Sequence, residues 1–295
     1  MQSATQRRRG FTLIEVLVVI AIIGLLLAIA LPSMSGARQQ ARSTVCQTNL
    51  RTLGQGWGMY ADENHDTMVP GRLPKHTPGG FANPANLYAI STGLKYRPRW
   101  PQLMQQHVGA QALDKPLTYR DRQNYHNPVY VCPSVAEWTD ERNAAYGYNY
   151  QFLGSHRVKG ERLRVLSMRS RLKDSGKTVV IADSMGSAAA FPARDRLIYE
   201  NNTRDEKRRG NYGWLIDPPR LEAKSSRAGG PGSKRSAPDP RHKDKTDVVY
   251  ADGHAELNSL KDLGYAVNSD GRVLDSGEGA HNRLFSGSSD DRDPP

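Results

Sequence analysis

The hydrophobic and polar positions divide the chain into a short apolar beginning and a long mixed remainder. From Phe11 to Leu31 almost every residue is apolar, and Glu15 is the one charged side chain. At about 1.5 Å per residue, a helix of this length covers the roughly 30 Å hydrocarbon core of a membrane. The pattern therefore predicts a transmembrane helix over residues 11–31. A basic leader, residues 1–10, precedes it and ends in Arg7, Arg8, Arg9 and Gly10.

Past Pro32 the pattern predicts that the helix continues as an exit helix over residues 32–60. Large apolar residues recur there at spacings of three and four, which places them on one stripe that should pack on a globular domain: Cys46, Leu50, Leu53, Trp57 and Tyr60. Gly54, Gly56 and Gly58 lower helix stability, so we expect fraying or bending near them. A coiled coil is the rival interpretation, but it needs more clean heptads than the segment offers.

Short β-rich runs bounded by Gly, Pro and Asn predict strands in the remainder. These runs are residues 129–131, 178–182, 197–199, 214–216 and 248–251. We expect an α+β fold, in which the long N-terminal helix packs on a small antiparallel sheet within a domain of residues 61–285. Residues 201–241 are rich in Arg, Lys, Gly, Ser and Pro, which predicts a mobile insertion. The polar segment 286–295 is expected to be a disordered tail.

Composition fits a soluble domain behind an anchor. Hydrophobic residues make up 37% of the chain, enough for one modest core. The formal net charge is +11, from 41 Lys plus Arg against 30 Asp plus Glu. That charge could attract DNA, anionic lipid or an acidic polysaccharide. Because the basic residues are scattered through loops without interleaved aromatics, a solvated surface is favoured and nucleic-acid binding is not expected.

Glu15 is the residue that a plain anchor does not explain. A carboxylate inside a membrane costs about 2.5 kcal/mol or more unless it has a partner. Cleavage between Gly10 and Phe11 would create an α-amino group one helical turn away, or within reach of a neighbouring copy. An ordinary secretory signal has a shorter apolar core, no carboxylate and a small-residue cleavage site, an alternative that Ala28 and Ala30 leave open.

The run Gly10-Phe11-Thr12-Leu13-Ile14-Glu15 resembles the class III signal of type IV pilins and type II secretion pseudopilins. Pro32 resembles their helix-bending proline. The resemblance implies that a prepilin peptidase cuts between Gly10 and Phe11 and methylates the new N-terminus. It also implies that Glu15 sets the register between subunits, so the expected partners are other pilin-like subunits, membrane lipid and the inner-membrane secretion or pilus assembly machinery.

Charge placement predicts the orientation. Arg7, Arg8 and Arg9 adjoin the apolar segment, and such residues favour the cytoplasmic side. We therefore expect a single-pass inner-membrane protein with a cytoplasmic N-terminus and a periplasmic C-terminal domain.

A second motif joins His242 to Asp252 and Gly253 across nine intervening residues. It resembles the prepilin-associated H-X9-DG domain of pseudopilin-like proteins in bacteria such as planctomycetes. The blocks at 46–50, 131–134, 147–150 and 180–183 resemble that family's other landmarks. A strand over 248–251 should run into a turn at Asp252 and Gly253, where Gly supplies a positive φ.

Several side chains near this motif are candidates for catalysis or metal binding. A His with a carboxylate can act in acid–base catalysis or bind a metal, and Asp183, Asp247 and His254 are further candidate ligands. Without a nucleophile motif, hydrogen bonds that fix a strand explain His242 and Asp252 better, and no enzymatic activity is expected. No cofactor is required; calcium, with Asp183 and Asp252 as weak candidate ligands, is the alternative that the carboxylates and the family resemblance leave open.

The two cysteines, Cys46 and Cys132, would lie outside the cytoplasm, where a disulfide can persist. Pairing would tie the exit helix to the sheet; two free buried thiols are the alternative. Zinc is disfavoured, since neither Cys belongs to a C-x-x-C motif.

These features favour a structural function, that of a prepilin-like subunit of a type II secretion pseudopilus or type IV pilus-like filament. The alternatives are a membrane-anchored basic protein that binds DNA or acidic polysaccharide, and a tethered metal-dependent hydrolase.

Overall fold

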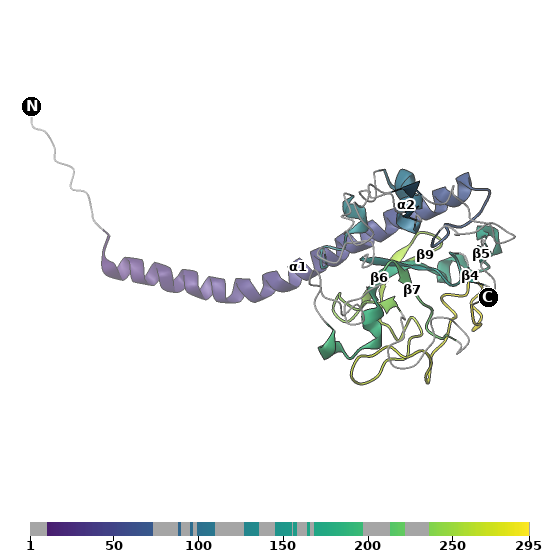
Figure 1. The fold of residues 1–295 in the computed structure, drawn as a ribbon. Helices are drawn as coiled ribbons and strands as arrows, with labels where there is room; N and C mark the ends of the chain where they lie inside the picture. Colours follow the sequence, from purple (N-terminus) through teal and green to yellow (C-terminus); the bar gives the residue numbers. More distant parts are fainter. Residues whose placement is uncertain are drawn as a thin grey trace, which may run out of the picture. The chain divides into compact units, whose positions relative to one another are not determined.

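The computed structural model describes residues 11–72, 88–89, 95–96, 99–109, 127–135, 145–154, 156–157, 164–165, 168–196, 213–221 and 236–294. The chain divides into two compact units, residues 1–41 and 42–295. Helix α1 (Leu13–Glu63) begins in the first unit and ends in the second (Figure 1). The predicted transmembrane and exit helices are therefore one element, with Pro32 inside it.

In the first unit, α1 exposes its apolar side chains. Ile14, Leu17 and Ile20 are 72%, 57% and 58% exposed. The most apolar 18-residue window of α1 has a mean hydropathy of 3.1, and none of it is buried. By length and composition this helix can cross a membrane, as predicted for residues 11–31.

The second unit is built on a mixed sheet. Its strand order is β10 (Ala255–Asn258), β9 (Thr246–Tyr250), β6 (Val179–Gly186), β3 (Tyr146–Asn149) and β7 (Leu215–Ile216), and β8 (Ala237–Pro238) also pairs with β6. All pairs are antiparallel except β3 with β7. The α+β class is confirmed, and the prediction of a wholly antiparallel sheet is wrong for that one pair. All eight residues of β6 are buried, so the core lies on both faces of this strand.

Short elements complete the described fold. Strand β1 (Tyr88–Ala89) pairs with β2 (Lys95–Tyr96), and β4 (His156–Arg157) pairs with β5 (Arg164–Val165). Helix α2 spans Trp100–Met104. The 3-10 helices are η2 (Gln105–Val108), η3 (Pro128–Tyr130), η5 (Arg169–Arg171), η6 (Ser175–Lys177), η7 (Ser187–Ala190) and η8 (Ala193–Asp195).

The predicted stripe of α1 packs into the core of the second unit. Cys46, Leu50, Leu53 and Trp57 are all at most 1% exposed, and Tyr60 packs against the same core from its edge. The spacing of apolar residues thus identified the buried face of the helix correctly.

The glycines of α1 do not end the helix, because it continues through them to Glu63. A Cβ on Gly54 would lie 2.7 Å from Val249 Cγ2, and one on Gly56 would lie 2.6 Å from Val108 Cγ1. These distances are shorter than any tolerable carbon contact, so both glycines allow close packing. The predicted fraying is wrong, since packing outweighs the low helix propensity of Gly.

The predicted strands have mixed outcomes. Runs 178–182, 214–216 and 248–251 correspond to β6, β7 and β9. Run 129–131 is wrong: Pro128–Tyr130 forms a 3-10 turn, in which the Asn127 side chain accepts a hydrogen bond from Val129 N. Run 197–199 lies outside the described residues.

Parts of the predicted mobile insertion are buried, which corrects that expectation. Residues 213–221 and 236–241 supply β7 and β8, and Trp214 O accepts a hydrogen bond from the Trp100 indole. The reason is local: Trp214 and Leu215 carry enough apolar area to join the core. Residues 201–212 and 222–235 lie outside the described part.

The predicted disordered tail also packs on the domain over residues 286–294. Asp291 accepts hydrogen bonds from the Asn282 backbone N–H and from Arg220, and Asp293 pairs with Arg220. Buried Phe285 anchors the start of the segment. Composition indicated disorder because it does not show that Asp291 and Asp293 have a partner, Arg220, 71 and 73 residues earlier in the chain.

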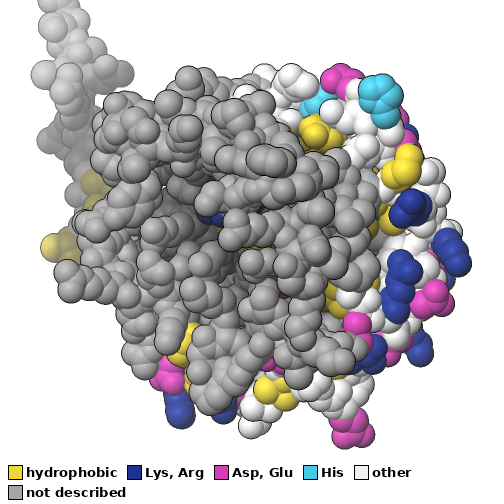
Figure 2. Space-filling view, turned by 45° about the vertical axis from the view of Figure 1, so that its right-hand side comes forward, with side chains coloured by type: hydrophobic (Ala, Val, Ile, Leu, Met, Phe, Trp, Pro, Cys, Tyr) yellow, Lys and Arg dark blue, Asp and Glu magenta, His cyan; other side chains and the backbone are white. Residues whose placement is uncertain are grey.

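Basic and acidic side chains are interspersed on the described surface. On the face shown in Figure 2, Lys and Arg lie among Asp and Glu. Arg169 pairs with Asp62 and Asp66, and Arg272 pairs with Asp270. Some of the positive charge in the described residues is thus locally neutralised.

Candidate functional site

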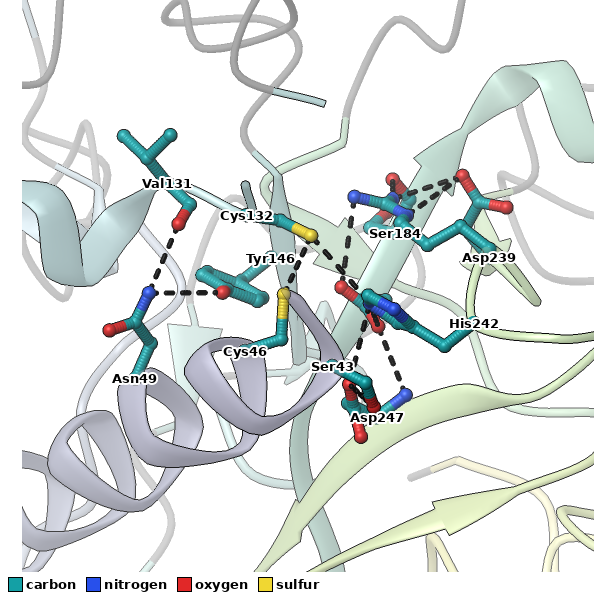
Figure 3. Close-up of polar contacts among 12 residues, drawn as sticks. Ser43, Cys46, Asn49, Val131, Cys132, Tyr146, Ser184, Asp239, His242 and Asp247 are labelled. Carbon is teal, nitrogen blue, oxygen red and sulfur yellow. Dashed lines mark hydrogen bonds and ion pairs between the residues drawn. The ribbon is translucent and has the colours of Figure 1, made fainter. Parts of the chain in front are cut away.

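Four separate segments of the second unit bring polar side chains into one buried cluster (Figure 3). Cys46 comes from α1, Cys132 from the chain after η3, Asp183 from β6 and His242 from the turn before β9. One ligand atom from each lies within 4.8 Å of the others. The exposed fractions are 0% for both thiols and Asp183 and 6% for His242.

Local backbone structure places each member. Cys46 heads the buried stripe of α1, and the tight turn at Lys243 and Asp244 presents His242. Both turn residues have positive φ, at 54° and 62°, and His242 and Lys245 exchange backbone hydrogen bonds of 2.9 and 3.2 Å. Asp tolerates this conformation better than Lys does, and the paired backbone hydrogen bonds between His242 and Lys245 close the turn.

The contacts inside the cluster are close. Cys46 Sγ lies 2.7 Å from Cys132 Sγ, and Cys132 Sγ lies 3.7 Å from His242 Nε2. His242 Nε2 is 3.3 Å from both Asp183 Oδ2 and Asp247 Oδ2. The imidazole is therefore shared between two carboxylates and a sulfur.

Neighbouring groups hold the carboxylates in position. The Asp247 backbone N–H donates to Asp183 Oδ2 at 3.0 Å, and Ser43 Oγ donates to Asp247 Oδ2 at 3.2 Å. Arg241 Nη1 is 3.7 Å from Asp183 Oδ1, while its Nη2 pairs with Asp239 and donates to the Ser184 carbonyl. Positions 239 and 241 flank the His242 motif, but no sequence pattern marked them as part of the site.

The electrostatics of the cluster favour positive charge. Burial lowers the pKa of His242, but hydrogen bonds to Asp183 and Cys132 outweigh this effect and raise the pKa to about 10. Burial, followed by the charge of Asp183, raises the pKa of Asp247 to about 6. The hydrogen bond to Cys132 raises the pKa of Cys46. These shifts favour a protonated imidazole at His242.

His242 and Asp252 bracket β9, as predicted, but they do not form a pair. The carboxylates beside His242 belong to Asp183 and Asp247, while half-exposed Asp252 bonds the His254 ring nitrogen at 2.6 Å. Gly253 has a φ of 91°, so the predicted turn is confirmed. Of the two weak calcium candidates, Asp183 therefore lies in the buried cluster and Asp252 in this exposed His–Asp pair.

Glu15 has hydrogen-bond partners within its own helix. Its carboxylate accepts from the Thr12 backbone N–H at 2.8 Å and from Thr12 Oγ1 at 2.9 Å, and Thr12 Oγ1 accepts from Glu15 N at 3.3 Å. This reciprocal arrangement is a capping box at the start of α1. The capping box gives the Glu15 carboxylate hydrogen-bond donors but no positive charge, so the expectation that cleavage supplies a cation for Glu15 stays a prediction. Phe11 is 84% exposed, and Gly10 lies outside the described residues.

Comparisons with known proteins match the N-terminal part of the chain. Residues 5–31 match the prokaryotic N-terminal methylation motif. The type II secretion system core protein G of Escherichia coli K12 is 37% identical over 62 residues, which cover 21% of this chain and 43% of that protein. The type IV major pilin protein PilA of Myxococcus xanthus is 47% identical over 47 residues, or 16% and 21% of the two chains.

A third relative is the type IV wide pilus major component PilA4 of Thermus thermophilus, 42% identical over 57 residues, or 19% of this chain and 44% of that protein. The chain thus spans less than half the length of these curated relatives. No solved structure matches it. The N-terminal part of the chain is thus similar to that of type IV pilins and type II secretion pseudopilins. The resemblance of residues 242–253 to the H-X9-DG domain stays a prediction.

Proposed function

We propose that this pilin- or pseudopilin-like chain is a structural subunit of a type II secretion pseudopilus or type IV pilus-like filament. One observation carries the proposal: a methylation motif over residues 5–31 overlaps the first part of a helix whose large apolar side chains are exposed there in the described part of the chain. Such side chains are stable in lipid or against copies of the same helix. The role is that of a subunit and not of an enzyme.

Processing and anchoring belong to the same proposal. A prepilin peptidase would cut between Gly10 and Phe11 and methylate Phe11, while residues 11–31 hold the subunit in the inner membrane. The arginines of the leader support a cytoplasmic N-terminus and hence a periplasmic second unit.

Glu15 connects processing to assembly. Its capping box begins the helix and satisfies the carboxylate oxygens, but hydrogen bonds from Thr12 leave one negative charge uncompensated in an apolar setting. The α-amino group at Phe11, in the same subunit or its neighbour, supplies the opposite charge after cleavage. This pairing would select the register in which adjacent helices pack.

The structure offers a substitution that separates the two roles of Glu15. Gln at the third helical position retains the capping-box hydrogen bond but carries no charge. We expect Glu15→Gln, expressed with the peptidase and assembly machinery, to enter the membrane and be cleaved but to fail in cross-linking to other subunits. Glu15→Ala should fail in the same way. Thr12→Ala, which weakens the cap but keeps the charge, is the matched control and should still assemble.

The same three variants can refute the proposal. If Glu15→Gln assembles as well as the unmodified chain while Glu15→Ala does not, Glu15 serves as a helix cap only. If both variants assemble fully, the carboxylate has no part in filament formation.

A further inference from the structure

The buried cluster contains more ligand chemistry than a structural contact requires. Cys46, Cys132, Asp183 and His242 supply two sulfurs, a carboxylate oxygen and an imidazole nitrogen, and all four side chains are buried. Three of the four segments are joined by contacts that span 86 and 110 residues of sequence. The fold, and not a short motif, assembles the set.

We propose that Cys46, Cys132, Asp183 and His242 bind one zinc ion that joins α1 to the sheet. This inference does not depend on filament assembly. Zinc takes four ligands of these types in tetrahedral geometry, with sulfur at about 2.3 Å and nitrogen or oxygen at about 2.0 to 2.2 Å. Calcium does not fit this cluster, because it prefers six to eight oxygen ligands and avoids thiolates.

The distances between ligand atoms are close to those that such an ion needs. Two ligands of a tetrahedral zinc lie about 3.3 to 3.8 Å apart, by geometry from the bond lengths. His242 Nε2 is 3.3 Å from Asp183 Oδ2 and 3.7 Å from Cys132 Sγ. The two sulfurs, at 2.7 Å, would separate by about 1 Å on binding. All four ligand atoms lie within 4.8 Å of one another, so movements of about 1 Å would bring them to zinc-binding distances.

A second observation points to a missing cation. Asp183 Oδ1 and Asp247 Oδ1 are buried and make no hydrogen bond within the described part of the protein. Arg241 Nη1 is 3.7 Å from the first, beyond hydrogen-bond distance. A buried carboxylate oxygen without a partner is costly, and a cation bound by Asp183 would offset that cost at the Asp183 carboxylate.

The surrounding residues match the outer shell of a metal site. Asp247 lies beside His242 and is held by Ser43, while Arg241 faces Asp183. Outer groups of this kind orient the ligands and balance their charge. When zinc binds, the two thiols and the protonated imidazole each release one proton to solvent, and the deprotonated groups then bind the ion.

A Cys46–Cys132 disulfide is the competing state of the same sulfurs. It would consume both thiols and leave the arrangement of His242 and Asp183 around them without a role. Zinc binding uses all four residues, which is why we favour it. The two states exclude each other, so a single sample distinguishes them.

The test measures the metal and thiol content of the full-length protein, purified in detergent without chelator. The protein is dialysed first against excess zinc and then against metal-free buffer, which removes unbound zinc. Inductively coupled plasma mass spectrometry should find about one zinc per chain. Cobalt in its place should give a sulfur-to-cobalt charge-transfer band. Cys46→Ser and His242→Gln should each lose most of the metal, whereas His254→Ala, in an exposed His–Asp pair outside the cluster, should retain it.

The unmodified chain can overturn the inference by itself, so the test does not depend on whether any variant folds. If it retains no zinc after dialysis, the inference is wrong, whether mass spectrometry finds two free thiols or an intramolecular disulfide. The inference would also be overturned if His242→Gln and Cys46→Ser, shown to be folded by circular dichroism, each retained the full amount of zinc.

Discussion

Trp57 donates its indole N–H to the hydroxyl oxygen of Tyr148 at 3.1 Å, and both side chains are 1% exposed. The bond joins the last third of α1 to β3, which lies between β6 and β7 in the sheet. The bond lies within a core in which Leu50 and Leu53 supply apolar contacts. Apolar contacts do not depend on orientation, whereas a hydrogen bond does, so this bond helps to fix how α1 is oriented on the sheet.

This contact predicts the effect of Tyr148→Phe. The substitution leaves the Trp57 N–H buried without its acceptor, which costs about 1 to 3 kcal/mol of unfolding free energy. Denaturant unfolding of the full chain in detergent measures it. Tyr60→Phe, on the half-buried edge of the same helix, is the control and should change stability by less than about 0.5 kcal/mol. Equal effects for the two variants would mean that the indole bond contributes little.

Two glycines of α1 should respond in opposite directions to alanine. Helix propensity alone predicts that Gly→Ala stabilises by up to about 1 kcal/mol. At Gly58 a Cβ meets no atom closer than Arg169 Nη1 at 3.9 Å, so Gly58→Ala should stabilise. At Gly54 it meets Val249 Cγ2 at 2.7 Å, so Gly54→Ala should destabilise by about 1 to 3 kcal/mol. Two stabilising results would show that α1 packs less closely on β9 than described.

Asn282 should be the residue that holds the C-terminal segment in place. Its buried side chain accepts from Arg220 N at 2.8 Å and donates to the carbonyls of Arg220 and Arg292. Asn282→Ala removes these bonds and should lower stability by about 1 to 3 kcal/mol. It should also expose residues 286–294 to proteolysis. Asp290→Asn, on the exposed part of the same segment, should have neither effect.

The sequence predicted elements whose signal is local. The stripe from Cys46 to Trp57 identified the buried face of α1, and the apolar runs at 178–182 and 248–251 identified β6 and β9. The run at 129–131 misled because its apolar residues suit a strand equally well. The Asn127-Pro128 pair, a cap followed by a residue favoured at the first helical position, was the overlooked signal for a 3-10 turn.

The candidate site could be predicted only in part. Pairing of Cys46 with Cys132 was considered, and Asp183 was named as a candidate ligand beside His242, but no pattern indicated that all four residues meet, because they lie on segments brought together by the sheet. The absence of a C-x-x-C motif argued against zinc on grounds of spacing, and spacing carries no information about ligands from four separate segments. Arg241 and Ser43 have no sequence signature at all, since their roles follow from position alone.

The mature N-terminus tests the central claim most directly. Intact-mass and peptide mass spectrometry of the protein, expressed with an active prepilin peptidase and recovered from membranes, should find a chain that begins at Phe11 and carries one methyl group on its α-amino nitrogen. A chain that still begins at Met1 under these conditions, or one cleaved after the apolar segment, would contradict the account of a processed, membrane-anchored filament subunit.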